Sequence, residues 1–341
     1  MFIVRPAASS DIPALEALIR DGAPGVHTLP RTRATIGEAV QRSMAAFSAQ
    51  PDRPGAESYM FVLESLEDRQ LAGTATMSAT AGASGTFFSF RREVINQVSR
   101  DLGISHNVHA LTLCTDLTNC SQLSGFFMHE QWRTKPEAAL LSRARLLYAA
   151  WAPHRFSEQF FASMPGITDA DGRSPFWEAL GRKFFRMDFL EAERMIEGAR
   201  NRTLIAELMP HYPVYVPLLP AEAQAALGQV HPAGAMAARI LRAEGFMQDN
   251  YVDLFDGAAI LQAHRNALHA FTRSRRRSAT AKSIETGRAS PCLVSAAGDG
   301  RFRALLADCA LPGGADTVAL PAEAMRALDV VQGDPLLCVK L

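Results

Sequence analysis

Apolar and polar residues alternate along the first eighty positions in patterns that predict both strands and a helix. Residues 2–5 form a short apolar run, and the polar segment 9–11 precedes apolar residues spaced as on one face of a helix. Two further apolar runs, 59–64 and 71–79, flank a polar turn and predict two neighbouring strands. Together these segments predict a β-α-β-β opening.

A strand followed directly by a helix is predicted near the middle of the chain. Residues 125–128 are largely apolar, a short basic turn follows, and 137–151 have the pattern of an amphipathic helix. A strand that runs straight into a helix leaves the first helical amides without partners, and such amides can hold a phosphate. The unit is therefore a candidate acyl-CoA site. An ordinary strand-helix unit of an α/β core is the alternative.

Two later segments have similar endings. Residues 159–164 predict a strand, and the segments 174–185 and 237–246 each read as a helix in which glycine allows a sharp turn and an aromatic residue starts a new strand. The shared ending suggests two copies of one α/β unit packed together, whereas two unrelated helix stops would give the same pattern.

The last part of the chain changes character. Polar and basic residues dominate 271–288, which is typical of a solvated linker, with phosphate binding as the alternative. Four short β-type runs follow, separated by glycine, proline and aspartate, and 321–328 read as a short helix among them. The predicted fold class is therefore mixed α/β (α+β) with a small C-terminal β-rich, barrel-like domain.

Composition narrows the classes of function. The chain has 341 residues, enough for two or three compact units, and its 35 basic and 35 acidic residues balance, so net charge recruits neither nucleic acid nor an acidic membrane. No apolar run approaches the roughly 20 residues of a membrane span, and the first residues lack a signal-peptide layout, which predicts a cytoplasmic protein. The five cysteines include no Cys-x-x-Cys pair, so free thiols and no metal site are expected.

Several long phrases of the sequence, in order, resemble the arginine N-succinyltransferase family, which has the acyl-CoA N-acyltransferase (GNAT) fold. The phrases are Ser58–Glu64, Phe88–Arg91, Asp116–Thr118, Ser174–Phe185, Ala206–Tyr215, Gly228–Pro232, Glu244–Phe246 and Tyr251–Gly257. The resemblance extends over nearly the whole chain, and the phrases look closest to the alpha subunit of the arginine/ornithine succinyltransferases that work as two related subunits.

The resemblance implies a function and a division into domains. The function is transfer of a succinyl group from succinyl-CoA to the α-amine of L-arginine in arginine catabolism, with L-ornithine left open as acceptor. Succinyl-CoA would be a co-substrate, no cofactor would be permanently bound, and the chain would form a homo-oligomer or a hetero-oligomer with a related subunit. Residues 1–195 and 196–272 would be tandem GNAT-like halves, the first with the acyl-CoA strand and loop and the second with the catalytic histidine, and 289–341 the small β-rich domain.

A histidine is the predicted catalytic residue. His231 in Gly-Gln-Val-His-Pro matches the family's proton donor, and imidazole, with an ordinary pKa near 6.5, exchanges protons at neutral pH. Apart from the resemblance, a histidine before proline is more often a capping or surface residue. His129, His106 and His109 are competitors, and each is more easily explained as structural.

The predicted succinyl-CoA contacts lie in the central strand-helix unit. Phe126 aligns with the family's succinyl-CoA contact, and we expect the main chain of this strand to pair with the pantetheine amides as an added strand would. The basic residues that follow lie where the pyrophosphate would pass, or else on a solvated face. The predicted contacts are Phe126, Phe127, Met128, Arg133, Lys135 and Ala138, with Arg143 and Arg145 farther along the helix.

The phosphate loop departs from the family pattern. The usual Gln/Arg-x-x-Gly-x-Gly/Ala reads here from Arg133 to Ala138, with Pro136 in place of the first glycine. Proline suits a helix start but has no amide to donate, and Glu137 adds a negative charge beside the phosphates. This favours an alternative function, a CoA-weak structural or regulatory subunit of a hetero-oligomeric succinyltransferase. An acyltransferase that acts on another amine is a third reading.

The acceptor site requires carboxylates for a guanidinium and a cation for the succinyl carboxylate. Arg91, Glu93 and Asp116 lie in family-like phrases before the central strand and are the predicted substrate-binding residues. An internal salt bridge or a turn cap is the alternative for each of them.

Overall fold

The computed structural model describes residues 1–20, 30, 32–83, 85–189, 191–192, 208–281, 289–298, 300–310 and 316–340. Its strands are β1 (Phe2–Pro6), β2 (Ser58–Ser65), β3 (Leu71–Ser78), β4 (Ser89–Ser99), β5 (Ile104–Cys114), β6 (Ser121–Met128), β7 (Gln159–Ser163), β8 (Val214–Tyr215), β9 (Met247–Val252), β10 (Ala259–His264), β11 (Arg275–Thr280), β12 (Ala289–Gly298), β13 (Arg301–Ala310), β14 (Thr317–Ala319) and β15 (Pro335–Lys340). The α-helices are α1 (Ile12–Arg20), α2 (Arg33–Ser48), α3 (Pro136–Trp151), α4 (Pro175–Ala179), α5 (Gly181–Phe185), α8 (Ala221–Ala226), α9 (Ala235–Glu244), α10 (His269–Thr272) and α11 (Ala322–Leu328).

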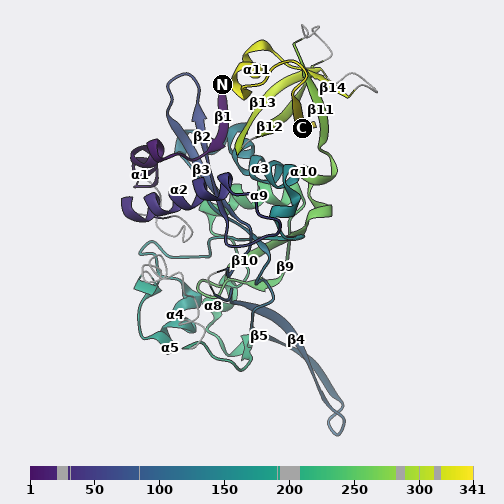
Figure 1. Cartoon of the computed structure of the whole chain (residues 1–341). Coiled ribbons are helices and arrows are strands. Elements are labelled where there is room, and N and C mark those ends of the chain that lie inside the picture. The colour runs from purple at the N-terminus through teal and green to yellow at the C-terminus, as the bar shows by residue number, and fades with distance from the viewer. Residues whose placement is uncertain are drawn as a thin grey trace.

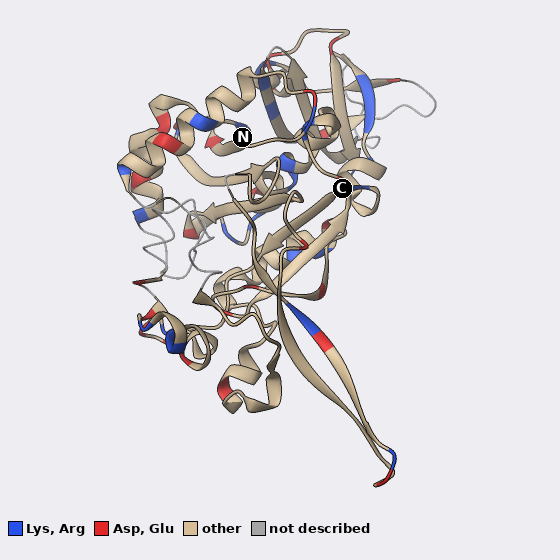
Figure 2. Ribbon diagram, turned by 60° about the horizontal axis from the view of Figure 1, so that its bottom comes forward, with Lys and Arg blue, Asp and Glu red and all other residues tan. Residues whose placement is uncertain are grey.

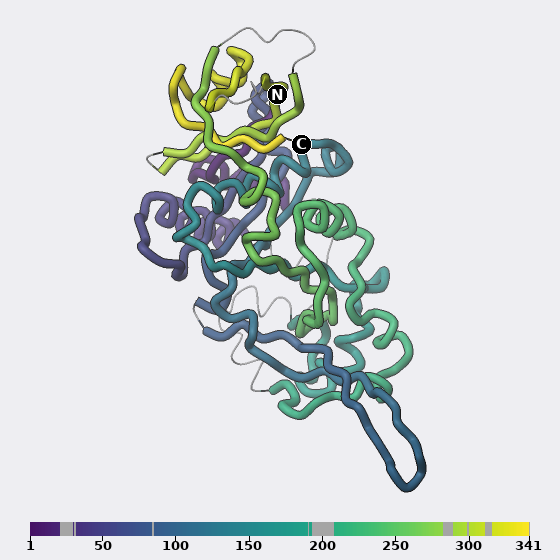
Figure 3. Tube along the Cα trace, turned by 90° about the vertical axis from the view of Figure 1, so that its right-hand side faces the viewer, coloured from purple at the N-terminus to yellow at the C-terminus, as the bar shows by residue number. Residues whose placement is uncertain are grey.

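The described strands form one hydrogen-bonded sheet in the order β12-β15-β11-β14-β13-β1-β2-β3-β6-β7-β10-β9-β4-β5-β8. The β-rich unit lies at one end of the molecule beside both termini, and the β4–β5 hairpin projects from the other end (Figures 1 and 3). The predicted α/β class with a small C-terminal β-rich domain is confirmed. The division at 195, 272 and 289 remains a prediction.

Helices cover both faces of the N-terminal strands. On α1, the apolar stripe of Leu15, Leu18 and Ile19 is buried with Met60 and Val62 of β2, and α2 packs in the same cluster. On the opposite face, α3 packs in the main core, which includes residues of β2, β3 and β7. The predicted β-α-β-β opening is confirmed, although the sequence analysis did not predict α2.

A bulge in β6 opens the centre of the sheet. The β3–β6 register shifts between Thr74 and Thr76, and Gly125 has a φ of +58°, which glycine adopts at little cost. The extra residue changes the alternation, so the Phe126 side chain packs on the α3 side and Phe127 packs with α1 and α2. On its other edge β6 pairs in parallel with β7 only at Ser121↔Phe160 and Gln122↔Phe161. The two strands therefore diverge just before the bulge.

The segment 174–185 is not one helix. It folds as α4 and α5, separated at Leu180, whose φ of −124° and ψ of −71° are not helical. Gly181 begins α5, where a Cβ would collide with the Trp177 ring, and the described chain forms no strand directly after Phe185. Of the two segments, α9 alone has the predicted ending, in which a glycine ends the helix and a strand follows. There Gly245 has a φ of +114° and β9 follows. The two phrases are therefore not copies of one local structure.

The β4–β5 hairpin was not predicted. Its eleven-residue strands pair in continuous register from Ser89↔Cys114 to Ser99↔Ile104. Four apolar side chains near its end are 49–73% exposed, namely Val94, Val98, Leu102 and Ile104.

The interpretation of 271–288 as a linker was wrong for its described part. Residues 275–280 form β11, which pairs with β15 and β14 inside the β-rich unit, and 282–288 lie outside the described residues. The unit shares the main sheet and core, because Val4 of β1 pairs with Ala304 of β13 and the Phe302 ring contacts the rings of Phe61 and Tyr148. The five cysteines all lie in described segments, and none forms a disulfide.

Charged residues of both signs are distributed over the described chain. Basic and acidic residues are interspersed over the body, and a basic segment lies next to an acidic one near the base of the hairpin (Figure 2). Among the described helices, none combines the length and the apolar character needed to cross a lipid bilayer.

Candidate active site

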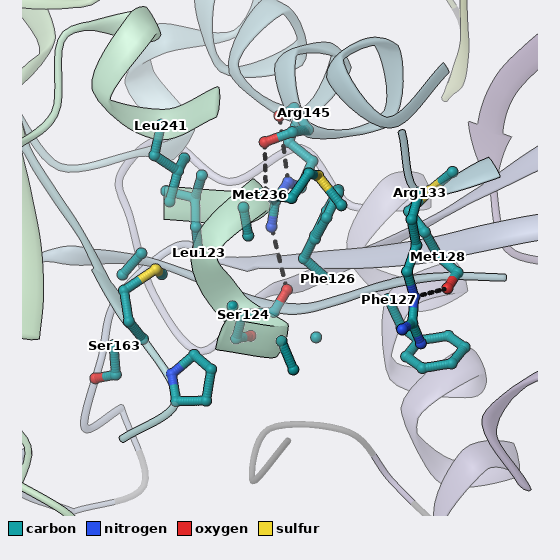
Figure 4. A pocket seen from close by; sticks show the side chains of 18 residues that line it. Leu123, Ser124, Phe126, Phe127, Met128, Arg133, Arg145, Ser163, Met236 and Leu241 are labelled. Atoms are coloured by element: carbon teal, nitrogen blue, oxygen red, sulfur yellow. Dashed lines mark hydrogen bonds between the residues drawn. The ribbon is translucent and has the colours of Figure 1, made fainter. Parts of the chain in front are cut away.

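A pocket lies where β6 and β7 diverge (Figure 4). The end of β6 forms one side, the end of β7 and Pro165 form another, and α3 and α9 close it. Its interior volume is about 90 Å³, enough for several ordered waters or a short acyl chain. The lining residues are Leu123, Ser124, Gly125, Phe126, Phe127, Met128, Arg133, Ser142, Arg145, Ala162, Ser163, Met164, Pro165, Ala233, Gly234, Met236, Ala237 and Leu241.

The predicted pantetheine strand borders this pocket. Phe126, Phe127 and Met128 all line it, together with Arg133 from the following turn. In the described residues, β6 has no strand partner on its β7 side beyond Gln122. A strand edge of this kind can pair with the amides of an extended ligand. The geometry thus places the predicted main-chain contacts around one cavity.

The start of α3 follows directly on this strand. Pro136 is the first residue of α3 and Lys135 its N-cap, which makes no side-chain capping bond. Arg133 Nε donates to the Met128 carbonyl at 3.2 Å, and Lys135 Nζ lies 4.0 Å from the centre of the Trp132 ring. The Ala138 amide already donates to the Lys135 carbonyl. The loop therefore presents two cations and few amides.

Glu137 lies in the first turn of α3. One of its carboxylate oxygens, Oε2, is buried and has no hydrogen-bond partner in the described part of the chain. A carboxylate is favourable at a helix N-terminus, which is also where a pyrophosphate would bind, so the two anions would repel each other. In the structure, Pro136 and Glu137 therefore still disfavour pyrophosphate binding by this loop.

His231 stands beside the pocket. Its backbone N–H donates to the Pro165 carbonyl at 2.8 Å, and it caps the short 3₁₀ helix Pro232–Gly234, whose Ala233 and Gly234 line the cavity. The Ala233 N–H donates to Nδ1 of His231 at 3.2 Å. This hydrogen bond assigns the proton of the neutral imidazole to Nε2. Nε2 makes no hydrogen bond to another residue in the described part of the chain.

Close packing fixes the position of this short helix. A Cβ on Gly234 would lie 2.5 Å from Cγ of Pro165, so only glycine lets the turn approach the end of β7 this closely.

The competing histidines are placed differently. His129 follows β6 at the N-cap position of a short 3₁₀ helix, without a side-chain capping bond, and its Nδ1 is buried with no partner in the described residues. His106 and His109 are exposed on the projecting hairpin. None of the three lines the pocket between β6 and β7.

The predicted substrate residues form one cluster at the base of the hairpin. Arg91 donates to Oε1 of Glu93 at 2.7 Å and to Oδ2 of Asp116 at 2.8 Å. Two residues that the sequence analysis missed complete it, since Thr112 donates to Glu93 and the Tyr251 hydroxyl donates to Asp116 at 2.9 Å. One cation for two carboxylates leaves a net charge of −1.

The contacts in this cluster favour the ionised form of Glu93 and the protonated form of Tyr251. The Thr112 hydroxyl, followed by Arg91, lowers the pKa of Glu93 below its usual range. Burial and the bond to Asp116 raise the pKa of Tyr251 to about 12, so its hydroxyl remains a donor at neutral pH. The internal salt bridge that was the alternative to substrate binding is present. Because its net charge is −1, the cluster can also bind a cationic ligand.

Pocket residues outside the motifs were also missed. Ser142, Ser163 and Met236 line the cavity but lie in ordinary helix and strand patterns, so only the fold brings them together. Arg143 and Arg145 do not form a solvated pair, because Arg143 contacts the buried Glu244 and Arg145 is itself buried.

The comparisons with known proteins agree on one family. The family described as arginine N-succinyltransferase beta subunit matches residues 2–270, and its C-terminal domain matches 275–340. Arginine N-succinyltransferase subunit alpha of Pseudomonas aeruginosa is 40% identical over 98% of both chains, and subunit beta of the same organism is 37% identical over 80% of this chain and 79% of its own.

A solved structure extends this similarity to the fold. Arginine/ornithine succinyltransferase subunit AI from Pseudomonas aeruginosa superposes with a TM-score of 0.88 at 37% identity, covering 100% of this chain and 98% of its own. Arginine N-succinyltransferase of Photorhabdus laumondii is 34% identical over 100% of this chain and 98% of its own. The chain therefore belongs to the arginine N-succinyltransferase family.

Proposed function

We propose that the chain transfers the succinyl group of succinyl-CoA to the α-amine of L-arginine, as a step of arginine catabolism. The observation that carries the proposal is the pocket between β6 and β7. There the open edge of β6, Arg133 of the turn before α3 and the short helix capped by His231 meet in a member of this family.

In the proposed reaction one proton is transferred, and a C–N bond replaces a C–S bond. The neutral amine attacks the thioester carbon, a C–N bond forms, and the C–S bond breaks with its electron pair on sulfur. The proton lost by the amine ends on the leaving thiol. His231 would hand it over through Nε2, because the Ala233 N–H already occupies Nδ1.

Thiol release tests this proposal. With succinyl-CoA and L-arginine, the folded chain, alone or with a related partner subunit, should release CoA thiol at a rate that depends on arginine. L-Ornithine in a parallel assay determines whether the acceptor site accepts the shorter amine. Absence of arginine-dependent release from both preparations would contradict the catalytic function.

The acceptor guanidinium is assigned to the cluster of Arg91, Glu93 and Asp116. The support is its excess negative charge and its half-exposed position, with 37% of the Asp116 side chain accessible. A guanidinium binds carboxylates through paired, charge-assisted hydrogen bonds. Asp116 would have to serve Arg91, Tyr251 and the substrate together.

Asp116→Asn tests this assignment. Removing the charge should raise KM for L-arginine about tenfold, the size of one charge-assisted hydrogen bond, and leave KM for succinyl-CoA unchanged. Asp329→Asn is the matched control, since Asp329 forms an exposed pair with Arg301 on the β-rich unit. An unchanged KM for arginine in Asp116→Asn would place the guanidinium elsewhere.

A second candidate function is a CoA-weak structural or regulatory subunit. The observation that favours it is the start of α3, where proline removes one amide and Glu137 adds a carboxylate in the first turn. Thermal stabilisation by succinyl-CoA separates the two functions, because a ligand that binds only the folded state raises its melting temperature.

Pro136→Gly should tighten CoA binding. Glycine restores an amide donor and backbone freedom, which together contribute about 1 kcal/mol, or roughly a fivefold lower Kd in calorimetry. Pro153→Gly is the control, because Pro153 also begins a short helix, at an exposed position outside the pocket lining. Equal or weaker binding by Pro136→Gly would show that this loop does not hold the pyrophosphate.

Assembly with a related subunit is also part of the proposal. It is supported by the relatives named as alpha and beta subunits and by the apolar side chains exposed on the hairpin. Light scattering of the chain alone and mixed with such a subunit measures the mass directly, and a monomer in both samples would contradict assembly. A cytoplasmic location remains a prediction.

A further inference from the structure

A buried arginine without a carboxylate partner lines the pocket between β6 and β7. Arg145 lies on α3, only 2% of its surface is exposed, and its guanidinium reaches down from the helix toward Ser124 (Figure 4). Burying a cation costs free energy unless an anion or several dipoles offset it. Within the described residues, every hydrogen-bond partner of Arg145 is uncharged.

Neutral groups hold the guanidinium in place. Nη1 donates to the carbonyls of Thr76 at 3.0 Å and Ser124 at 3.1 Å, beside the β6 bulge. Nε donates to the Ser142 carbonyl at 3.4 Å and Nη2 to the Ser142 hydroxyl at 3.2 Å. These bonds use four of five N–H groups, and the second N–H of Nη2 has no partner in the described structure. Burial alone lowers the pKa of Arg145 to about 9.

The neighbouring arginine on α3 behaves in the ordinary way. Arg143 Nε lies 3.1 Å from Oε2 of the buried Glu244, so its charge is paired within the chain. Two arginines two residues apart therefore differ in one respect. The one outside the pocket has its own carboxylate, and the one that lines the pocket has none among the residues that the structure describes.

We propose that Arg145 is the acyl-chain specificity residue, which binds the free carboxylate of the acyl group through Nη2 and so selects a dicarboxylic acyl thioester. The inference rests on the proposed function, since it concerns the acyl group held in this pocket. Nη2 has a spare donor and the cavity has room for a short acyl chain. An uncharged acyl chain would leave the cation with neutral partners alone and give it no anionic one.

Comparison of two thioesters tests the proposal. Butyryl-CoA has a four-carbon acyl chain like that of succinyl-CoA but ends in a methyl group. With L-arginine as acceptor, kcat/KM of the unmodified protein should be about 100-fold higher for succinyl-CoA, as expected for a charged hydrogen bond inside a pocket. In Arg145→Met this ratio should fall close to one, and Arg145→Lys should retain part of it.

Arg155→Met separates specificity from stability. Arg155 also donates to backbone carbonyls, those of Ala46 and Ala49, but it does not line this pocket. Its replacement should lower stability and leave the succinyl-to-butyryl ratio unchanged. A purely structural Arg145 would lower activity with both thioesters equally.

The outcomes also separate this inference from the proposed function. Equal kcat/KM of the unmodified protein for both thioesters would overturn the role of Arg145 alone, and this comparison requires no variant to fold. A ratio that survives in Arg145→Met would overturn it too. If neither thioester gives arginine-dependent thiol release, the proposed function fails and the inference fails with it.

Discussion

Replacement of His231 by glutamine is expected to lower kcat about 100-fold or more, while KM for succinyl-CoA changes little. Glutamine can keep a side-chain acceptor for the Ala233 N–H, so the short helix beside the pocket should remain capped. It cannot exchange a proton near neutral pH. The loss should therefore appear in turnover measured by thiol release.

The chain contains a matched control for this variant. His264 caps another short 3₁₀ helix in the same way, with the Asn266 N–H donating to Nδ1 at 3.1 Å, but it does not line the pocket. His264→Gln should keep nearly full activity. A stable His231→Gln protein that is almost as active as the unmodified one would remove His231 from the mechanism and direct attention to His129.

The largest effect on stability is expected from Trp177→Ala. Trp177 is fully buried, its ring stacks on Phe255 with centroids 5.6 Å apart, and its Nε1 donates to the Met187 carbonyl at 3.1 Å. Removing a buried tryptophan leaves a cavity and costs about 3–5 kcal/mol. Urea denaturation should show a free energy of unfolding lower by that amount.

Trp132→Ala provides the comparison. Trp132 is half-buried and contacts the Phe2 ring and Lys135 at the surface, so its removal should cost clearly less. Equal losses in the two variants would show that the buried Trp177 contributes no more to the free energy of unfolding than the half-buried Trp132.

Elements with a strong apolar period could be predicted from the sequence. The β1 to β3 opening, the β6–α3 unit and the β-rich strands are each marked by apolar residues that the fold buries. The break between α4 and α5 could not, because it depends on Gly181 lying against Trp177, a contact made by the folded chain. The basic strand β11 was misread, since its Arg275 and Arg276 side chains are exposed while its backbone pairs on both sides.

The site was predictable to the extent that it lies in local phrases. The predicted β6 residues, with Arg133, do line one cavity, and His231 stands beside it, but these roles remain predictions. The burial of Arg145 could not be foreseen. A helix pattern shows which residues share a face, but it does not show that a bulge in a strand distant in sequence will provide carbonyls for one of them.

The projecting β4–β5 hairpin has a consequence for how the molecule exchanges its amide hydrogens. Beyond its base it is a two-stranded ribbon with apolar side chains exposed, so opening it disrupts little of the core and requires far less free energy than global unfolding. In an isolated chain its amides should exchange early. Slow exchange of these amides would show that another molecule covers the ribbon. The exchange rate of the hairpin amides therefore measures whether the chain has assembled.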